Sequence, residues 1–354
     1  MLSAGDSQGW NEARGTRGAR RYPGVVRDAP AAPAALLSST PMRIMTVLAI
    51  VGLCVSFALR EGRDERFDRF ADPKLFVNTV EAMRDDGLGY YEAMDRELRA
   101  RIGPAETPRA FRMPTIFLFW RLLPGEDALW LGFVALAGAV AVVLMGVSAV
   151  PVLGIVIAAY LLNLGFNAFT IVEFWALLPI AIAIASWRGE QWWLAAGMAL
   201  LAVLIRETTL LLLLGGLLAA HVQRRPRAPW LVALGLAVAA LIAHVVATQP
   251  YLVGQGTEAP LLFTGDIVIM LKTMGVGLPA PVVLGPIVWL AGVAAVWRDE
   301  RLRFFLGPHL LLPLVGLLVF RIFWGILVTP FALLFALDLL VVTASHRRGV
   351  LSET

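Results

Sequence analysis

Residues 61–123 read EGRDERFDRFADPKLFVNTVEAMRDDGLGYYEAMDRELRARIGPAETPRAFRMPTIFLFWRLL, and this polar stretch decides how the rest of the chain must fold. Twelve of the chain's 26 acidic residues fall in it, and the sequence on either side is strongly apolar. Over the whole chain, 58% of residues are hydrophobic, 16% are charged and the mean hydropathy is +0.74. A long polar stretch between apolar runs is typical of an extramembrane loop in a membrane protein.

Outside this stretch, apolar runs of roughly 18 to 22 residues recur, each long enough to cross the hydrocarbon core of a bilayer as a helix. The backbone finds no water to bond in lipid, so these runs must be helical, and the period-2 alternation of a β-barrel is not seen. We therefore expect an all-α fold, a polytopic membrane helical bundle of about ten transmembrane helices over residues 42–345. The expected spans are 43–59, 127–149, 151–164, 168–187, 191–205, 208–222, 230–248, 280–297, 304–320 and 325–343.

The two ends of the chain fall outside this bundle. Residues 1–41 are rich in Ala, Gly, Pro, Ser and Arg and show no apolar periodicity, which predicts a disordered N-terminal segment. Residues 346–354 form a short tail. The single cysteine, Cys54, lies in an expected span, so a disulfide within the chain is excluded, and no Cys/His zinc pattern occurs.

Arginine residues mark every second loop between the expected spans. They occur in loops 186–191, 223–229 and 298–303 and in the tail, whereas loops 163–167 and 249–265 hold no Lys or Arg. The positive-inside rule then predicts cytoplasmic N- and C-termini in the plasma (inner) membrane and places residues 60–123 on the outer face. This pattern also accounts for the net charge of +4 without nucleic acid as a partner.

Within the outer loop, the local signals predict short interfacial helices. Asp72 before Pro73 favours an N-cap followed by proline at the first helical position. An apolar stripe and two terminating glycines follow, at Phe76, Val80, Met83, Gly87 and Gly89. A second stripe at Tyr91, Met94 and Leu98 ends at Gly103-Pro104. Residues 111–123 are apolar but too short to span, which predicts an interfacial or re-entrant helix.

Acidic residues of this loop are the candidates for general acid–base chemistry. A carboxylate at the outer mouth of a bundle can accept a proton from a hydroxyl, and Asp72 is the first candidate, with Asp64 and Glu65 in reserve. The alternative for Asp72 is a helix cap, and the two roles are compatible. For Asp64 and Glu65, which alternate with arginines, the alternative is a solvated charged face.

Arg206 and Glu207 interrupt two apolar runs on the outer side. Charges at membrane depth are costly and indicate function, although the pair could also mark a tight turn whose arginine reaches the interface. Arg321 falls at another outer span end. Glu173 and Asp338 lie within expected spans, where each would pair with an arginine or form an interhelical hydrogen bond.

Arg112, two residues before Pro114, and Arg121 bring guanidinium groups to the membrane surface. Guanidinium groups bind phosphate in a bidentate way, and anchoring to lipid headgroups is the alternative. The sequence contains no Walker loop, HExxH or GxSxG motif. The four histidines show no ligand spacing and are interpreted as span-end or packing residues.

The order of these features resembles the GT-C superfamily of polyprenyl-phosphate-sugar-dependent membrane glycosyltransferases. The resemblance rests on one span before a long outer loop, an early Asp at 72, Gly89-Tyr90-Tyr91 a helix later, Arg112-Met113-Pro114, and Arg206-Glu207-Thr208 between later spans. It covers most of the chain from residue 42. Some members mark the first loop with an acidic pair, which Asp64-Glu65 also spells, so the catalytic position stays open between Asp72 and this pair.

The resemblance implies transfer of a sugar from a polyprenyl-phosphate carrier to a glycan, lipid or protein acceptor on the outer face, by direct displacement with a carboxylate base. It implies substrate-binding residues at Tyr90, Tyr91, Arg112, Arg206, Glu207 and Arg321. No cofactor is expected, and the need for a divalent cation varies within the superfamily. The alternative function is a multi-pass transporter or lipid flippase with Glu173, Arg206 and Asp338 along a pathway, and a further alternative is a membrane scaffold.

Overall fold

The computed structural model describes residues 39–59, 71–101, 103–165, 169–253, 278, 280–314 and 325–352. All regular secondary structure in these ranges is helical, so the expected all-α class is confirmed for this part of the chain. The predicted disordered segment lies outside the described residues except for its last three positions. In chain order the α-helices are α2 (Thr40–Ala58), α4 (Ala71–Asp85), α5 (Tyr90–Arg101), α6 (Thr115–Trp120), α7 (Glu126–Val147), α8 (Leu153–Gly165), α9 (Val172–Arg188), α10 (Trp192–Ile205), α11 (Leu210–Val222), α12 (Ala228–Thr248), α14 (Pro281–Arg298), α15 (Gly307–Leu310) and α17 (Gly325–Ser352).

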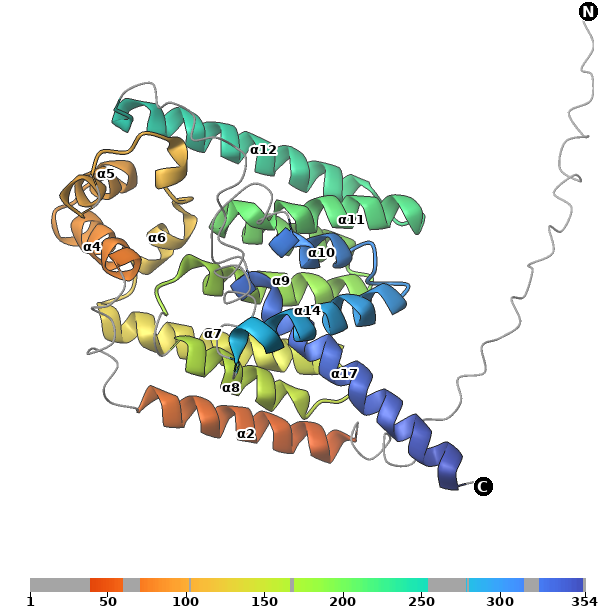
Figure 1. Ribbon diagram of the computed structural model, residues 1–354. Coiled ribbons are helices and arrows are strands. Elements are labelled where there is room, and N and C mark those ends of the chain that lie inside the picture. Colours follow the sequence, from red (N-terminus) through yellow and green to blue (C-terminus); the bar gives the residue numbers. More distant parts are fainter. Residues whose placement is uncertain are drawn as a thin grey trace, which may run out of the picture.

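Most of the helices form one bundle whose long axes run in similar directions, and α4, α5 and α6 gather at one end of it (Figure 1). Five helices in the described ranges are long and apolar enough to cross a membrane: Thr40–Ala58, Glu126–Val147, Ala228–Tyr251, Pro281–Arg298 and Leu327–Ser345. Three of them, the ones in α2, α12 and α14, have less than a quarter of their span window buried. Apolar surface on that scale suits contact with lipid and indicates a membrane protein.

The remaining expected spans are shorter than predicted. α8 and α11 have 13 residues each, α10 has 14 and α9 has 17, whereas crossing the hydrocarbon core takes about 20. The expected span 304–320 is wrong in its described part, because residues 301–306 form turns and α15 has only four residues. The figure of about ten full-length spans is therefore not supported by the described residues.

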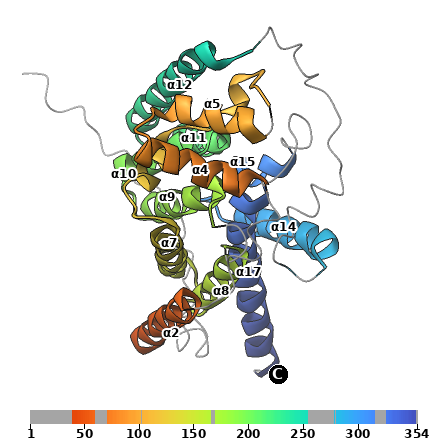
Figure 2. The same ribbon diagram turned by 90° about the vertical axis from the view of Figure 1, so that its left-hand side faces the viewer.

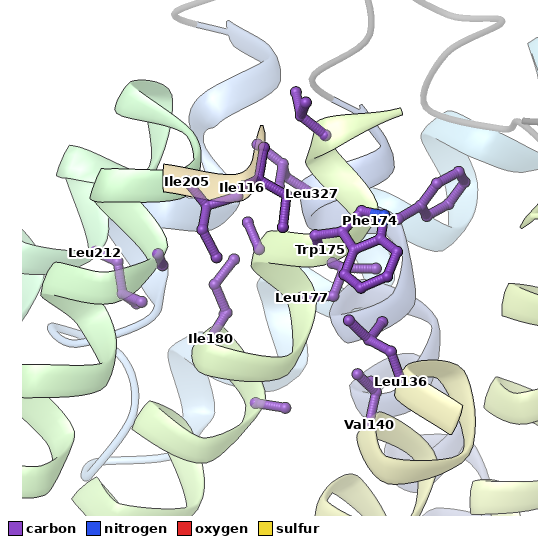
Figure 3. Close-up of a cluster of buried hydrophobic side chains, with 14 of the residues drawn as sticks. Ile116, Leu136, Val140, Phe174, Trp175, Leu177, Ile180, Ile205, Leu212 and Leu327 are labelled. Carbon is purple, nitrogen blue, oxygen red and sulfur yellow. The ribbon is translucent and has the colours of Figure 1, made fainter. Parts of the chain in front are cut away.

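Helix α9 forms the centre of the bundle. It buries side chains on all faces, including Phe174, Trp175, Leu177 and Ile180. Side chains from several neighbours converge on these residues, among them Leu136 of α7, Ile205 of α10 and Leu212 of α11 (Figure 3). A helix that is apolar all round requires such an enclosed position, which explains why its sequence shows no polar face.

The loops that carry arginine meet at one end of the bundle. This is the arrangement that the alternation of arginines predicts for the loops after α9, α11 and α14. The contacts are Arg188 Nη2–Asp299 Oδ2 at 2.6 Å, Arg225 Nη2–Glu190 Oε1 at 3.1 Å, and Gln223 Nε2 donating to the carbonyl oxygen of Glu300 at 2.9 Å.

Asp338 of α17 also contributes to this end. Its carboxylate accepts hydrogen bonds from Ser148 Oγ at 3.0 Å and from the backbone N–H of Ala149 at 3.1 Å, at the turn between α7 and α8. Asp338 therefore makes the interhelical hydrogen bond that was one of the two expectations for it.

The opposite end is covered by the short helices of the polar stretch. Figure 2, which views this end, shows α4 and α5 in front of the bundle. The layer is fastened to the end of α12 by a hydrogen bond from the backbone N–H of Val253 to the carbonyl oxygen of Ala105 at 3.0 Å, and by Arg99 Nη2 donating to the carbonyl oxygen of Tyr251 at 3.4 Å. We call α4, α5, η1 (Pro108–Ala110) and α6 the roof layer.

Candidate functional site

The roof layer holds its shape because its apolar stripes are buried. Phe76, Val80 and Met83 of α4 are at most 5% exposed, and Met94 and Leu98 of α5 are likewise buried. The first predicted stripe and Met94 and Leu98 of the second thus face the core, whereas Tyr91 is only partly buried. Packing rather than intrinsic helix propensity stabilises these short helices.

Glycines end the roof helices, as expected. α4 ends at Asp85 and Gly87 has φ +72°, while α5 ends at Arg101 and Gly103 has φ +121°. Residues that carry a side chain rarely adopt these φ angles, so glycine permits the turn that brings Tyr90 to the start of α5.

Asp72, the first candidate base, lies in the first turn of α4, which begins at Ala71. Asp72 therefore lies within the described helix rather than at its predicted cap position. A carboxylate in a first turn still interacts favourably with the helix dipole. The side chain of Asp72, like Asp64, Glu65 and Arg321, lies outside the described residues.

Tyr90, Tyr91 and Arg112 come together in the roof layer. The hydroxyl of Tyr90 donates to the carbonyl oxygen of Arg112 at 2.6 Å, and the two tyrosine rings meet edge to face with centroids 5.0 Å apart. Tyr90 is only 6% exposed. This hydrogen bond fixes the backbone at Arg112 and therefore the point from which the Arg112 side chain extends.

Tyr91 connects the roof layer to α12. Its hydroxyl forms a 2.9 Å hydrogen bond with Nδ1 of His244, and its ring lies against the rings of Phe111 and Tyr251. The sequence interpretation of His244 as a span-end or packing residue agrees with this position. Its hydrogen bond to Tyr91, however, could not be foreseen, because 153 positions separate the two residues.

Arg206 and Glu207 form a buried ionic cluster with Glu173. Arg206 Nε lies 2.8 Å from Glu173 Oε1, and Arg206 Nη1 donates to Glu207 Oε1 at 2.7 Å. The side chains of Arg206 and Glu173 are each 6% exposed, against 38% for Glu207. The expectation that Glu173 pairs with an arginine is confirmed, and the buried charges of Arg206 and Glu173 are tolerated because the two neutralise each other.

The ionic cluster and the roof layer are adjacent. Ile116 of α6 lies beside Ile205, the residue before Arg206 (Figure 3). Burial raises the pKa of Tyr90 well above its usual value, Tyr91 and the Glu207 carboxylate act in the same direction, and the Arg112 guanidinium acts against them.

Arg112 supplies a guanidinium without a counter-ion. Among the described residues it makes no ion pair and no side-chain hydrogen bond, although it is only partly exposed. The formal charges of Arg206, Glu173 and Glu207 sum to −1, so the ionic cluster keeps an excess negative charge. In the described ranges, no group of three or more His, Cys, Asp or Glu residues could hold a metal ion.

The structure thus gathers candidate residues in two clusters. One holds Tyr90, Tyr91 and Arg112, and the other holds Glu173, Arg206 and Glu207. Glu173 was not among the predicted substrate-binding residues, and its signal was an acidic residue within an apolar run. Comparison of the chain with protein-family models, with curated proteins and with solved structures finds no match.

Proposed function

We propose that the protein is a membrane glycosyltransferase that moves a sugar from a polyprenyl-phosphate carrier to an acceptor at the roof-layer end, which faces outward. The observation that carries the proposal is the guanidinium of Arg112, which makes no ion pair within the described residues and belongs to the roof layer, whose α6 contacts the helix α10 that leads into Arg206. An exposed apolar bundle with an anion-binding group at one end suits a substrate that has a lipid tail and a phosphate head.

Arg112 is the proposed ligand of the donor phosphate. In direct displacement, an acceptor hydroxyl forms a bond to the anomeric carbon while the bond from that carbon to the phosphate oxygen breaks. The phosphate leaves with the electron pair, so a nearby guanidinium stabilises the charge that develops on it. Arg112 is favoured for this role because Arg206 already forms salt bridges with two carboxylates.

The proton of the acceptor hydroxyl passes to a carboxylate, for which we propose Asp72, with Asp64 and Glu65 as the alternatives. The position of Asp72 at the start of α4 supports this assignment, because the roof layer also carries Tyr90 and Arg112.

A transfer assay tests the function. Purified protein in lipid nanodiscs is incubated with a set of radiolabelled polyprenyl-phosphate sugars and cell-envelope acceptors, and release of polyprenyl phosphate is measured. We expect turnover with at least one donor, and an Arg112→Ala variant should lower kcat/KM by about a hundredfold. Arg121→Ala is the matched control, because Arg121 is an exposed arginine at the far end of α6 and should change the rate little.

The transporter alternative predicts a different result. A transporter or flippase moves an intact labelled lipid or solute between the two faces of a vesicle and releases no carrier. Flux without carrier release would contradict the proposed transferase.

A further inference from the structure

The turn between α10 and α11 holds two buried oxygen atoms that lack partners. Glu207 Oε2 and Thr208 Oγ1, both in η2 (Glu207–Thr209), are solvent-inaccessible and make no hydrogen bond within the described part of the chain. Buried polar atoms in native proteins are almost always hydrogen-bonded, because leaving one unpaired costs free energy. Two such atoms on neighbouring residues indicate a place for a polar group of a ligand.

Arg206 lies against both carboxylates of this cluster. Its Nη1 donates to Glu207 Oε1, whereas Nε lies 2.8 Å from Glu173 Oε1 and, like the two oxygen atoms, has no hydrogen-bond partner within the described part of the chain. Glu173 alone neutralises Arg206, and this pair is sealed from solvent. The negative charge on Glu207 is therefore not needed to neutralise Arg206, and Glu207 is more exposed than Glu173.

The arrangement orients Glu207. Arg206 holds Oε1 at 2.7 Å, which leaves Oε2 as a fixed acceptor. The neighbouring Thr208 hydroxyl can donate or accept. A carboxylate oxygen and a hydroxyl on consecutive residues are complementary to the hydroxyl groups of a sugar, each of which donates one hydrogen bond and accepts others. It is not complementary to phosphate, which the carboxylate repels.

From these contacts we infer that Glu207 binds a hydroxyl group of the donor sugar, and that Arg206 and Glu173 are positioning residues that hold it. The inference rests on the proposed function and divides the substrate between two groups, with Arg112 on the phosphate and Glu207 on the sugar. A sugar bonded directly to a phosphate carries both chemical groups, so one donor molecule supplies a ligand for each residue.

Binding of two kinds of lipid probe to the protein in nanodiscs tests whether Arg112 binds the phosphate and Glu207 binds the sugar. The probes are a polyprenyl phosphate without sugar and a set of polyprenyl-phosphate hexoses and pentoses. Wild-type protein should bind at least one sugar-bearing lipid about tenfold more tightly than the bare lipid. Glu207→Ala should remove this preference and leave the Kd for the bare lipid within about twofold.

Two further variants separate binding from folding and from catalysis. Glu207→Gln keeps an acceptor oxygen and leaves Arg206 paired with Glu173, so it should fold, raise KM for the donor several-fold and change kcat little. Arg206→Lys keeps the charge but loses the guanidinium fork, so it should weaken binding of the sugar-bearing lipid while the bare lipid binds as before.

The opposing outcomes are distinct. A preference that survives Glu207→Ala, or an equal loss of affinity for both probes, would overturn the role of Glu207 in sugar binding. A hundredfold fall in kcat at unchanged KM in Glu207→Gln would also contradict sugar binding by Glu207 and would indicate that Glu207 transfers a proton. Wild-type protein that binds none of the lipids would instead overturn the proposed function on which the inference rests.

Discussion

The hydroxyl of Tyr91 on α5 lies 2.9 Å from Nδ1 of His244 on α12, and this hydrogen bond ties the roof layer to the membrane-spanning bundle. Tyr91→Phe keeps the ring contacts and removes the bond, so it should destabilise the attachment by about 1 kcal/mol. Hydrogen exchange of the α5 amides should become faster while the amides of α9 are unaffected, because a local opening does not require the bundle to unfold.

Tyr251→Phe is the matched control for this prediction. It makes the same change in the same aromatic group, but the Tyr251 hydroxyl makes no hydrogen bond within the described ranges. Equal exchange in the two variants would show that the bond between Tyr91 and His244 does not hold the roof layer.

Asp72 offers a test of catalysis against helix stability. If Asp72 only stabilises the first turn of α4, Asp72→Asn should cost roughly 0.3 to 1 kcal/mol and leave transfer nearly normal. If it is the general base, Asn and Ala variants should both lower kcat by about a hundredfold or more while the protein still folds. Asp85→Asn, at the other end of α4, is the control that should retain activity. Normal transfer by Asp72→Asn would move the search to Asp64 and Glu65.

The proposed orientation predicts a labelling pattern. In a Cys54→Ala background, Glu92→Cys on the roof layer should react with a membrane-impermeant thiol reagent in intact cells. Arg227→Cys, at the end of the bundle where the arginine loops meet, should react only after permeabilisation. Both positions are exposed, so access to the reagent depends on the side of the membrane rather than on burial. The reverse pattern would contradict the orientation and the outward-facing site.

Two helical glycines should respond oppositely to the same substitution. A Cβ at Gly292 of α14 would lie 2.5 Å from the Cα of Ala332 in α17, so Gly292→Ala should force these helices apart and lower stability by about 1 to 3 kcal/mol. Gly235 of α12 has nothing within 4 Å of that point, so Gly235→Ala should be neutral or raise stability by up to about 1 kcal/mol. Thermal unfolding in detergent measures both, and similar midpoints would mean that α14 and α17 do not pack closely.

Some features of the candidate site could be predicted from the local sequence, and others could not. Arg206 and Glu207 stood out in the sequence because charges rarely interrupt apolar runs, and Gly87 and Gly103 marked the helix ends because few other residues adopt their backbone angles. The contacts of Tyr91 with His244 and of Arg206 with Glu173 join residues far apart in the chain. No local pattern specifies such pairs, since they depend on how the helices pack.

The sequence by itself determined that this protein is a helical bundle with a polar roof, because hydrophobicity and helix-ending residues act over a few turns of chain. It also determined which loops share an end, because the positions of the arginines alternate with the spans. Only the tertiary structure decided how the charged turn at Arg206 is accommodated between the short helices α10 and α11, because Glu173 on another helix pairs with Arg206 there. It also decided that Arg206 is held by Glu173 and Glu207 while Arg112 is unpaired, since the partner of a buried charge is set by three-dimensional proximity.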